Sequence, residues 1–496
     1  MRSFRQPLLP RFLSLMRQYR HSACVGSYSM ASLTTRSLLM LLALSVMPGC
    51  SSFLRKPPAL SQEIPSAWRN QSESQTAVLG PAPDFHSWWR AFDDTELDHL
   101  VNQALQDNLT LAQAGYRVHA ARELAWHSQA SFLPNLSVHS LAIPNPTGSA
   151  SYFQLGPDVA WEIGLFGLSH NSNQVAQGDI GLAEADRQAA RVSLVAEVAR
   201  VYIVMRSAQQ RLALSEEIVA TLQHKLALTR IRLEQQLATT TELHRTEAEL
   251  SQAQSMLTEP QSAITQAQHQ LAVLLAQTEP DATLAAGITA PPTLRDLRID
   301  QTPADLLRTR PEIKRAEQAV LKSAGERGLA WADLFPKLTL HGLLTYSFSE
   351  SGKRVGDVDG IFSVGPSIDI PLFDWGQRRA ALHAREDELS AAVLAYRQSV
   401  LEGIAETETA LALVARLRLR TMQEQTTIAA LEQGDASIQA ALRLGLADGI
   451  ARADSSTALL QAKLQLVQTQ EAHSIAFILL YKALGGAPLP TPDATQ

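Results

Sequence analysis

The sequence predicts an α+β fold that is built twice within one chain. Three observations lead to this prediction: short motifs return at a nearly constant spacing, long stretches without proline carry a heptad pattern, and paired strand-like segments precede each stretch. Motifs that return in one order at nearly one spacing indicate a duplicated unit. The recurring motifs are Phe132–Leu136 and Leu334–Leu338, at an offset of 202; Leu165–Gly167 and Leu372–Asp374, at 207; and Leu274–Ala276 and Ala483–Gly485, at 209.

Each copy is predicted to contain a helix, a β-hairpin and a long helical hairpin. Residues 279–305 link the two copies, and residues 487–496 form a proline-rich tail. The first copy spans residues 98–278, with its β-hairpin at 136–163 and its helical hairpin at 174–277; the second spans 306–486, with the corresponding hairpins at 337–372 and 379–484.

The long helical stretches carry apolar residues at intervals of seven, the spacing of a coiled-coil seam. The first stretch has no proline from Gln174 to Gln236, and its 63 residues correspond to about 95 Å of helix. Pro260, inside the partner helix that follows, is predicted to kink or interrupt it. This periodicity alone is equally consistent with a soluble coiled-coil rod. The seam residues are Val198, Met205, Leu212, Val219, Leu226 and Leu233 in the first copy, and Leu382, Leu389, Tyr396, Ile404 and Leu411 in the second.

Four segments alternate apolar and polar residues and are bounded by turn-rich sequence, as β-strands are. They are predicted at residues 136–143, 152–163, 337–348 and 361–372. A small periplasmic sheet with core aromatics is one interpretation, and the wall of an outer-membrane barrel is the other. Four strands are too few to close a barrel in lipid, so the second interpretation requires several chains to share one barrel. The aromatic residues near the strand ends are Tyr152, Phe153, Trp161, Phe166, Tyr346, Phe348, Phe362, Phe373 and Trp375.

The N-terminus is typical of a bacterial lipoprotein signal. The apolar run Leu38–Met47 is too short to span a bilayer and is followed by Gly49 and Cys50. We therefore expect a signal peptide over residues 1–49, with Met30 as an alternative start, and a lipid on Cys50. An ordinary cleaved signal with an incidental cysteine is the alternative. Ser52, where an aspartate would favour the inner membrane, points to the outer membrane.

Composition excludes several functions. Without residues 1–49 the chain has 37 basic and 49 acidic side chains and a formal net charge of −12, which argues against nucleic-acid binding. Cys24 would be removed and Cys50 acylated, so no thiol remains for disulfides, zinc or catalysis. Residues 50–97 are expected to form the lipid anchor and an N-terminal periplasmic segment.

No motif for catalysis or for a cofactor stands out. The sequence contains no GxGxxG, no P-loop and no HExxH. Asp357–Gly360 looks like a fragment of a calcium loop, but Ile368 occupies the position of its final glutamate. We therefore predict no catalytic residue, no metal site and no cofactor other than the covalent lipid.

Four further motifs occur in one order between residues 60 and 487. With them the chain resembles the TolC/OprM family of outer-membrane efflux channels, in its lipoprotein branch. The motifs are Trp88–Asp94 with the leucine pattern that follows, Arg310–Ile313 with Ala330–Pro336, Pro371–Arg379, and Leu480–Gly486.

This resemblance implies a homotrimer in which each chain gives four strands to a twelve-stranded transmembrane β-barrel. Two helical hairpins per chain then continue the barrel as a long periplasmic α-helical coiled-coil tunnel. The implied function is the exit duct of a tripartite pump, which passes drugs or other toxic small molecules to the exterior. The implied partners are a periplasmic adaptor, an inner-membrane transporter of the RND type and outer-membrane lipid. The protein is not expected to be an enzyme.

The resemblance also assigns roles to the two hairpin tips, which are expected to meet the adaptor and to close the channel. Ile450 and Asp454 match the apolar ring and the aspartate ring of the periplasmic gate, and lie four residues apart on one helix face. We expect Arg443 and Asp448 to hold the closed tip through ion pairs. Gln236 stands where the family usually has glycine, so the first tip departs from the family's pattern at its turn. The tip residues expected to dock the adaptor are Gln236, Leu237, Thr239, Arg443, Leu444, Gly445 and Asp448.

A trimeric coiled-coil surface adhesin is the alternative from another class of protein, because it also combines four strands per chain with long helices. In such adhesins the four strands are contiguous at the C-terminus. Here about 170 residues separate the two β-hairpins, and the chain ends in a helix and a proline-rich tail. The connectivity therefore favours the channel.

Overall fold

The structure of the chain is a computed structural model. It describes residues 58, 60, 64–66, 68, 69, 87–143, 151–282, 284, 292, 294, 309–351, 354, 355 and 359–486. All of these residues belong to one compact unit, Lys56–Gln496. The predicted signal peptide, Cys50, most of the linker, the proline-rich tail and the first two residues of the calcium-like motif lie outside the described residues.

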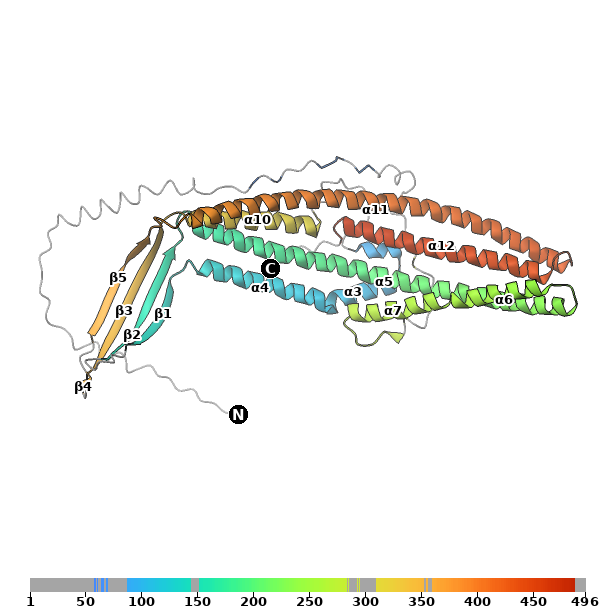
Figure 1. The fold of residues 1–496 in the computed structure, drawn as a ribbon, viewed down its shortest axis with the longest axis horizontal. Coiled ribbons are helices and arrows are strands. Elements are labelled where there is room, and N and C mark those ends of the chain that lie inside the picture. The colour runs from blue at the N-terminus through green and yellow to red at the C-terminus, as the bar shows by residue number, and fades with distance from the viewer. Residues whose placement is uncertain are drawn as a thin grey trace. The chain divides into compact units, whose positions relative to one another are not determined.

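The first copy begins with a short 3₁₀ helix and two helices, and continues through a β-hairpin into the first helical hairpin (Figure 1). Its longest helix starts six residues before the predicted Gln174, because Gly167 in the left-handed conformation provides the turn that lets it begin at Leu168. The elements are η3 (Trp88–Phe92), α3 (Thr95–Asp107), α4 (Leu109–Ala130), β1 (Asn135–Ile143), β2 (Ser151–Ile163), α5 (Leu168–Glu234), α6 (Thr240–Ser255) and α7 (Thr258–Leu274).

The second copy has the same order of helix, β-hairpin and helical hairpin. It contains a fifth strand that the sequence analysis did not predict, the two-residue β4, which pairs with the end of β3. Its last strand stops at Asp369 instead of Leu372, because Pro371 has no N–H with which to continue the ladder. The elements are α10 (Pro311–Ala332), β3 (Lys337–Ser351), β4 (Arg354–Val355), β5 (Asp359–Asp369), α11 (Gln377–Arg443) and α12 (Gly449–Ala483).

Pro260 interrupts the helix that returns from the first tip, as predicted. The helix divides between Ser255 and Thr258 into α6 and α7, and Pro260 lies in the first turn of α7. A proline is tolerated there, since the N–H groups of the first turn have no partner within the helix. In the second copy the equivalent helix, α12, runs unbroken for 35 residues.

The four long strands form an antiparallel sheet in the order β1, β2, β3, β5. Residues that face each other across the ladder lie on the same side of a sheet, so the register divides the side chains into two faces. One face carries Leu136, Val138, Leu155, Val159, Trp161, Leu338, Leu340, Leu344, Phe362, Val364 and Ile368; the other carries Ser137, His139, Leu141, Asp158, Glu162, Lys337, Thr339, His341, Leu343, Ile361, Ser363, Ser367 and Asp369.

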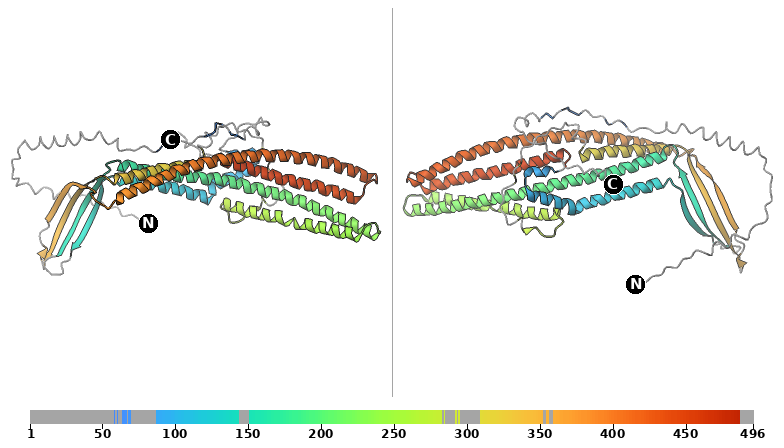
Figure 2. Two further views of the ribbon diagram at one scale, coloured as in Figure 1. Left: turned by 45° about the horizontal axis from the view of Figure 1, so that its top comes forward. Right: turned by 180° about the vertical axis from the view of Figure 1, so that it is seen from behind.

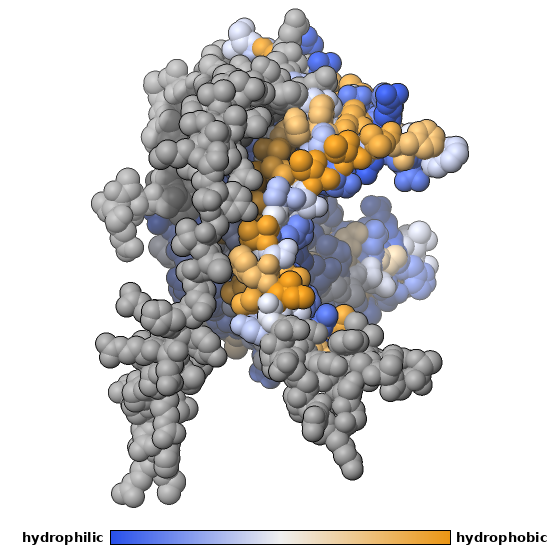
Figure 3. Space-filling model, turned by 90° about the vertical axis from the view of Figure 1, so that its left-hand side faces the viewer, coloured by the Kyte–Doolittle hydropathy of each residue, from blue (hydrophilic) through white to orange (hydrophobic). Residues whose placement is uncertain are grey.

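The sheet is therefore apolar on one face and mainly polar on the other. Leu136, Val364 and Phe362 of the apolar face are largely exposed. Figure 3, which looks at the end of the unit that carries the sheet, shows hydrophobic side chains gathered in a band there. An exposed apolar face of this extent marks a surface that meets lipid or another protein.

The two copies are related by two fixed offsets. Helix α4 and helix α10 have the same length and superpose in sequence at 202 residues, as do the starts of β1 and β3. From the end of the β-hairpins onward the offset is 209. Four pairs of residues with positive φ stand at this spacing: Phe166 and Trp375, Gly167 and Gly376, Gln236 and Gly445, and Ala276 and Gly485.

This register corrects one sequence match. Leu165–Gly167 was paired with Leu372–Asp374, at 207, whereas its structural counterpart is Asp374–Gly376. Both segments place a left-handed aromatic residue and a left-handed glycine directly before a helix of 67 residues. The match between leucine and phenylalanine in the two segments was misleading. The turn before each long helix repeats its backbone conformation but not the identity of its side chains.

The long helices pack side by side, with the sheet at one end and both hairpin tips at the other (Figures 1 and 2). Near the sheet, α4 packs on α5, α5 on α10, and α10 on α11; toward the tips, α6 and α7 pack on α5, α5 on α12, and α12 on α11. None of the helices in the described ranges is long and apolar enough to cross a membrane.

The main hydrophobic core lies midway along the helices and explains the opening Trp88–Asp94 motif. Trp88 stacks on Tyr481 of α12 with ring centroids 5.2 Å apart, and Phe92 packs edge-on against Phe477 at 5.6 Å. Asp94 caps α3 and accepts a hydrogen bond from the hydroxyl of Tyr202, whose pKa burial raises to about 12. The motif thus fastens the start of the first copy to both long hairpins.

Candidate functional site

Both helical hairpins turn through the same backbone motif at their tips. In the first, Gln236 N–H donates to Leu233 and Leu237 N–H donates to Arg232, at 2.9 and 2.7 Å. In the second, Gly445 and Leu446 make the corresponding bonds. This pair of bonds defines a Schellman motif, whose turning residue has a positive φ. Gln236 adopts φ 60°, close to the 73° of Gly445, so the first tip has the same geometry without the glycine.

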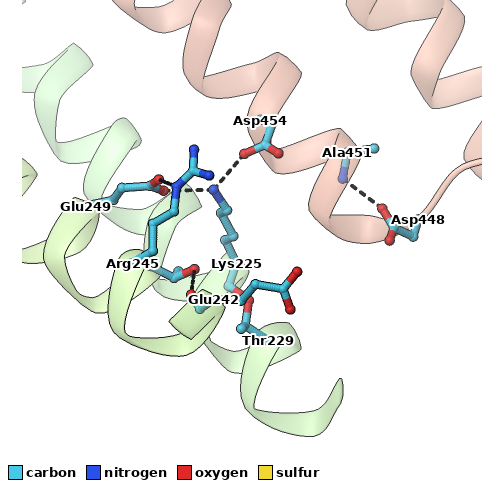
Figure 4. Close-up of polar contacts among 9 residues, drawn as sticks. Lys225, Thr229, Glu242, Arg245, Glu249, Asp448, Ala451 and Asp454 are labelled. Carbon is cyan, nitrogen blue, oxygen red and sulfur yellow. Dashed lines mark hydrogen bonds and ion pairs between the residues drawn. The ribbon is translucent and has the colours of Figure 1, made fainter. Parts of the chain in front are cut away.

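The helices that leave the tips begin at strong caps. Thr239 accepts a hydrogen bond from Glu242 N–H, and the Glu242 carboxylate accepts one from Thr239 N–H, which together form a capping box. Asp448 accepts from Ala451 N–H at 2.9 Å (Figure 4). Both caps end the turn at a fixed residue, so each tip is short and well defined.

The tips expose leucine side chains. Leu237, Leu444 and Leu446 are 68%, 74% and 79% exposed. In many Schellman motifs the residue after the turn packs back onto its own helix, but Leu237 and Leu446 occupy this position and face away. Their exposure leaves an apolar point at each tip that is available to another molecule.

An ion pair connects the two tips. Arg232, at the end of α5, donates through Nη1 to Asp448 Oδ2 at 2.8 Å, and both side chains are largely exposed. The sequence analysis expected Arg443 and Asp448 to form ion pairs at the tip but named no partner for either; the partner of Asp448 is Arg232. Arg232 lies more than 200 residues from Asp448, and no spacing rule relates residues on different hairpins.

A larger charged network lies nearly two helical turns from Asp448 along α12 (Figure 4). Lys225 of α5 is 11% exposed, and its Nζ lies 2.7 Å from Asp454 Oδ1 of α12 and 2.8 Å from Glu249 Oε2 of α6. Arg245 Nε donates to the other oxygen of Glu249 at 3.0 Å. The network therefore ties the second hairpin to both helices of the first.

The ionisation of these groups follows from their contacts. Burial alone lowers the pKa of Lys225, but the hydrogen bonds to Asp454 and Glu249 outweigh it, so the pKa lies above its ordinary value. Burial likewise raises the pKa of Glu249, and the hydrogen bonds from Lys225 and Arg245 bring it below the usual range. Lys225 and Glu249 are therefore both charged at neutral pH.

The predicted gate residues lie on the first two turns of α12. Ile450 is half-buried, and Asp454 follows it by one turn with 58% of its side chain exposed. Asp454 also lines a cavity of about 420 Å³ between α5, α6 and α12, together with Lys225, Glu249 and Met256. Asp454 therefore makes an ion pair with Lys225 and also borders this cavity. Within the described ranges no group of three or more His, Cys, Asp and Glu side chains converges as a metal site would.

The fold and the paired tips are shared with proteins of known class. The sequence profile of one protein family, outer membrane efflux protein, matches this chain twice, over residues 100–277 and 302–486. The chain is a member of the outer membrane efflux protein family. The two matched segments correspond to its two copies, and proteins of this family are channels and not enzymes.

Two relatives and one solved structure illustrate the similarity. Nodulation protein T of Rhizobium leguminosarum bv. viciae is 27% identical over 406 residues, which are 80% of this chain and 82% of the relative. Outer membrane protein OprJ of Pseudomonas aeruginosa is 27% identical over 425 residues, 82% of this chain and 87% of the relative. A structure of the outer-membrane channel OprN matches with a TM-score of 0.76 and 26% identity over 88% of this chain and 99% of that one.

These similarities confirm the predicted family and fold class. The chain has the α+β, internally duplicated fold of an outer-membrane efflux channel, with four long strands and two long helical hairpins. In channels of this fold several chains complete one barrel. This agrees with the sequence analysis, in which four strands per chain were too few to close a barrel.

Proposed function

We propose that three copies of this chain form the outer-membrane exit duct of a tripartite efflux pump. The duct passes drugs or other toxic small molecules from an inner-membrane transporter of the RND type, through a periplasmic adaptor, to the exterior. The observation that carries the proposal is that one chain combines a two-faced sheet with two helical tips at the far end of the same helices.

The sheet fits this function because its two faces suit two environments. The apolar face of β1, β2, β3 and β5 meets lipid, and the face with Asp158, Glu162 and His341 lines a water-filled pore. The open edges are β1 and β5, so three sheets joined edge to edge close a barrel with no unpaired backbone in the membrane. The long helices continue this duct into the periplasm.

The tips fit the adaptor. Leu237, Leu444 and Leu446 provide exposed apolar contacts, and Thr239 and Asp448 fix the turns rigidly beside them. Gln236, Arg443 and Gly445 complete the proposed docking residues. The ion pair from Arg232 to Asp448 is exposed and contributes at most about 1 kcal/mol, so docking of an adaptor can break it at little cost.

Asp454 and Ile450 are proposed to form the narrowest aperture. In a trimer three Asp454 carboxylates attract cations, as charged rings in channels do. We expect Asp454→Ala to raise single-channel conductance and weaken block by multivalent cations. Lys225→Met is the matched variant: it removes the cation that neutralises Asp454, and should strengthen the block. Wild-type block in both variants would show that Asp454 lies away from the aperture.

Cys50 is proposed to carry the lipid that anchors the mature N-terminus to the outer membrane. Two or more acyl chains hold a protein stably, whereas one does not. Cys50→Ser should reduce labelling by radioactive palmitate to background, while the trimer persists because the barrel itself lies in the membrane. Unchanged labelling would place the lipid elsewhere.

The function is tested by deletion of the gene in its native host, in a strain without a redundant channel. Susceptibility to several toxic compounds should rise, and the wild-type gene should restore it. Normal susceptibility and normal export would contradict the proposal. Cleavage of the segment 174–277 by protease added to intact cells would also contradict it, since that segment would then be displayed on the surface, as in an adhesin.

A further inference from the structure

A cavity of about 450 Å³ lies between the end of α3, α4 and α5, about 50 Å along α5 from the charged network described above. Its volume falls within the range of small-molecule sites, about 300–1,000 Å³. Apolar side chains, Leu105 and Leu111, line it together with His119 of α4 and with Arg187 and Arg191 of α5. No aspartate or glutamate among the described residues lines it. The cavity is therefore both basic and partly apolar.

The two arginines of this cavity have no anionic partner. Arg187 and Arg191 lie one turn apart on the same side of α5. Among the described residues no hydrogen bond or ion pair reaches either guanidinium group, and Nε of Arg191 is buried without a partner. Burial and the neighbouring charge of Arg187 both lower the pKa of Arg191. A buried donor of a charged group costs free energy unless something accepts its hydrogen bond.

The acidic residues that precede this pair on α5 are bonded to other helices. Glu184 accepts a hydrogen bond from Arg122 of α4 at 2.8 Å, and Asp186 accepts one from Arg315 of α10 at 2.9 Å. Neither carboxylate lines the cavity. The described residues therefore supply no anion to the cavity, and the missing acceptor is expected to come from a bound molecule.

The second copy shows that the fold does not require charge at this position. There Ile313 of α10 and Val400 of α11 are 5% and 1% exposed and form a hydrophobic cluster, against which Ile64 packs. Their counterparts in the first copy, at offsets of 202 and 209, are Leu111 and Arg191. An apolar residue at the position of Arg191 is thus compatible with the packing of the two helices. The same position is closed by apolar side chains in one copy and is open and basic in the other.

We propose that this cavity binds a small organic anion. Arg187 and Arg191 hold its carboxylate or phosphate group, and its apolar part lies against Leu105, Leu111 and Tyr116. A guanidinium group suits this role, because its N–H donors form a fork that matches the oxygens of both kinds of anion. The proposal goes beyond the efflux function proposed above and does not depend on it.

The walls of the cavity favour an anion that carries a ring or a short apolar chain. An inorganic ion would leave the leucine side chains without a contact, and an uncharged apolar molecule would leave the Arg191 guanidinium without an acceptor. Tyr116 lines the same cavity and is 76% exposed, so its ring is accessible to a ligand from solvent. A phosphate monoester should bind more tightly than a carboxylate, because its second charge can meet the second arginine.

Three probes that share a benzene ring test the site: phenyl phosphate, benzoate and benzylamine. Saturation-transfer difference NMR on the full chain, purified in detergent and kept at one ionic strength, measures the binding of each. Both anions should give ring-proton signals that saturate with concentration, whereas benzylamine should give none. The lower dissociation constant of the two anions tells whether the ligand carries a phosphate or a carboxylate. Equal binding of all three probes would overturn the proposal, since it would report only partition into an apolar phase.

Substitution of the arginines locates the site. Arg191→Met should weaken binding of phenyl phosphate at least about tenfold, as expected for the loss of hydrogen bonds to a charged group, and Arg187→Met should also weaken it. Arg117→Met is the matched control: it removes the same charge from α4 next to Tyr116, but Arg117 is exposed and lies outside the cavity. The control should bind as the wild type does. Unchanged binding in Arg191→Met, or an equal loss in all three variants, would overturn the proposal.

Urea unfolding separates a ligand-binding role of Arg191 from a packing role. Without a probe, Arg191→Met should be at least as stable as the wild type, because the substitution removes a buried donor that has no partner. Saturating phenyl phosphate should raise the urea midpoint of the wild type and leave that of the Met variant unchanged, since only the protein that binds is stabilised. A lower midpoint of the Met variant without a probe, or no effect of phenyl phosphate on the wild type, would overturn the proposal. The efflux function is tested separately by the deletion strain.

Discussion

The two helical hairpins have the same geometry but reach it with different residues. Their long helices both contain 67 residues, and all four turning residues stand at one offset. In the second hairpin the helix-ending residues are Gly445 and Gly485, which adopt positive φ freely. In the first they are Gln236 and Ala276, which adopt it at a cost of about 1–2 kcal/mol each. Packing along the helices, rather than local preference, therefore sets the first hairpin.

The hairpins also differ in how they are held together. Lys225 of the first is bonded to Glu249 and Asp454, whereas its counterpart in the second, Gly434, has open space around it. The helix returning from the first tip is broken at Ser255–Thr258, and its counterpart is continuous. The first hairpin is thus less favourable in its backbone and gains a polar cross-link at Lys225 that has no equivalent at Gly434, whereas the second is linked elsewhere, by Lys463 to Glu432 at 3.2 Å.

The largest expected effect comes from placing a residue of the first copy into the second. Gly325→Glu copies its counterpart in the first copy, Glu123, into the contact between α10 and α5, where its Cβ would lie 2.9 Å from a backbone nitrogen of α5. Overpacking and a buried charge should lower the free energy of unfolding by at least about 3 kcal/mol. Urea unfolding in detergent, followed by far-UV circular dichroism, measures it. Gly434→Ala is the control: its added methyl group meets nothing, and the gain in helix propensity should stabilise the protein by about 0.5–1 kcal/mol. Equal stability of the two variants would show that α5 and α10 are not close-packed at Gly325.

An intermediate effect is expected at the polar cross-link. Lys225→Met removes both hydrogen bonds but keeps a long apolar stem, and should cost about 1.5–3 kcal/mol at pH 7, the range for hydrogen bonds to charged groups. Hydrogen exchange of α6 should rise with it, since α6 loses its bond to α5. Lys225→Arg keeps the charge and should recover part of the loss. Unchanged exchange in the Met variant would contradict a stabilising role.

A comparison of wild type with Lys225→Met at different pH values tests the ionisation of Glu249. Because the pKa of folded Glu249 is lowered, its contribution is complete above the ordinary glutamate pKa of about 4.3 and is lost as the pH falls through the lowered value. The difference between wild type and Lys225→Met should therefore be full at neutral pH and shrink in the acid range. A difference that stays constant down to the acid range would assign the loss to packing instead.

The smallest effect is expected at the tips. Gln236→Gly relieves the left-handed residue but makes the unfolded chain more flexible, so the net gain should be about 0.5–1 kcal/mol. Gly445→Gln, which copies the first tip into the second, should cost a similar amount, since no neighbour contacts Gly445. Limited proteolysis at the tips measures both. The two substitutions should change the free energy of unfolding in opposite directions. If both lower it, the Gln236 side chain makes a contact that stabilises the tip by more than the left-handed conformation costs.

The parts of this structure that sequence predicts well are those with a local period. Seven-residue spacing indicated both long helices, and alternation indicated all four long strands. The start of α5 was missed because Ser169–Asn173 is rich in residues that favour turns, and only the left-handed Gly167 reveals that the helix has begun. The contacts from Arg232 to Asp448 and from Lys225 to Asp454 were also missed, since residues from different hairpins meet only when the repeats pack. The roles of Ile450 and Asp454 at the aperture remain predictions.

The equal length of α5 and α11 limits how such a gene can change in length. One residue inserted into either helix would rotate everything beyond it by about 100°, and so turn the packed face of the helix, the tip and the charged network away from their partners together. The seven residues by which the offset grows from 202 to 209 lie instead in the second β-hairpin and the corner after it. Insertions and deletions are therefore expected to accumulate where the chain turns between strands, while the long helices α5 and α11 keep their length.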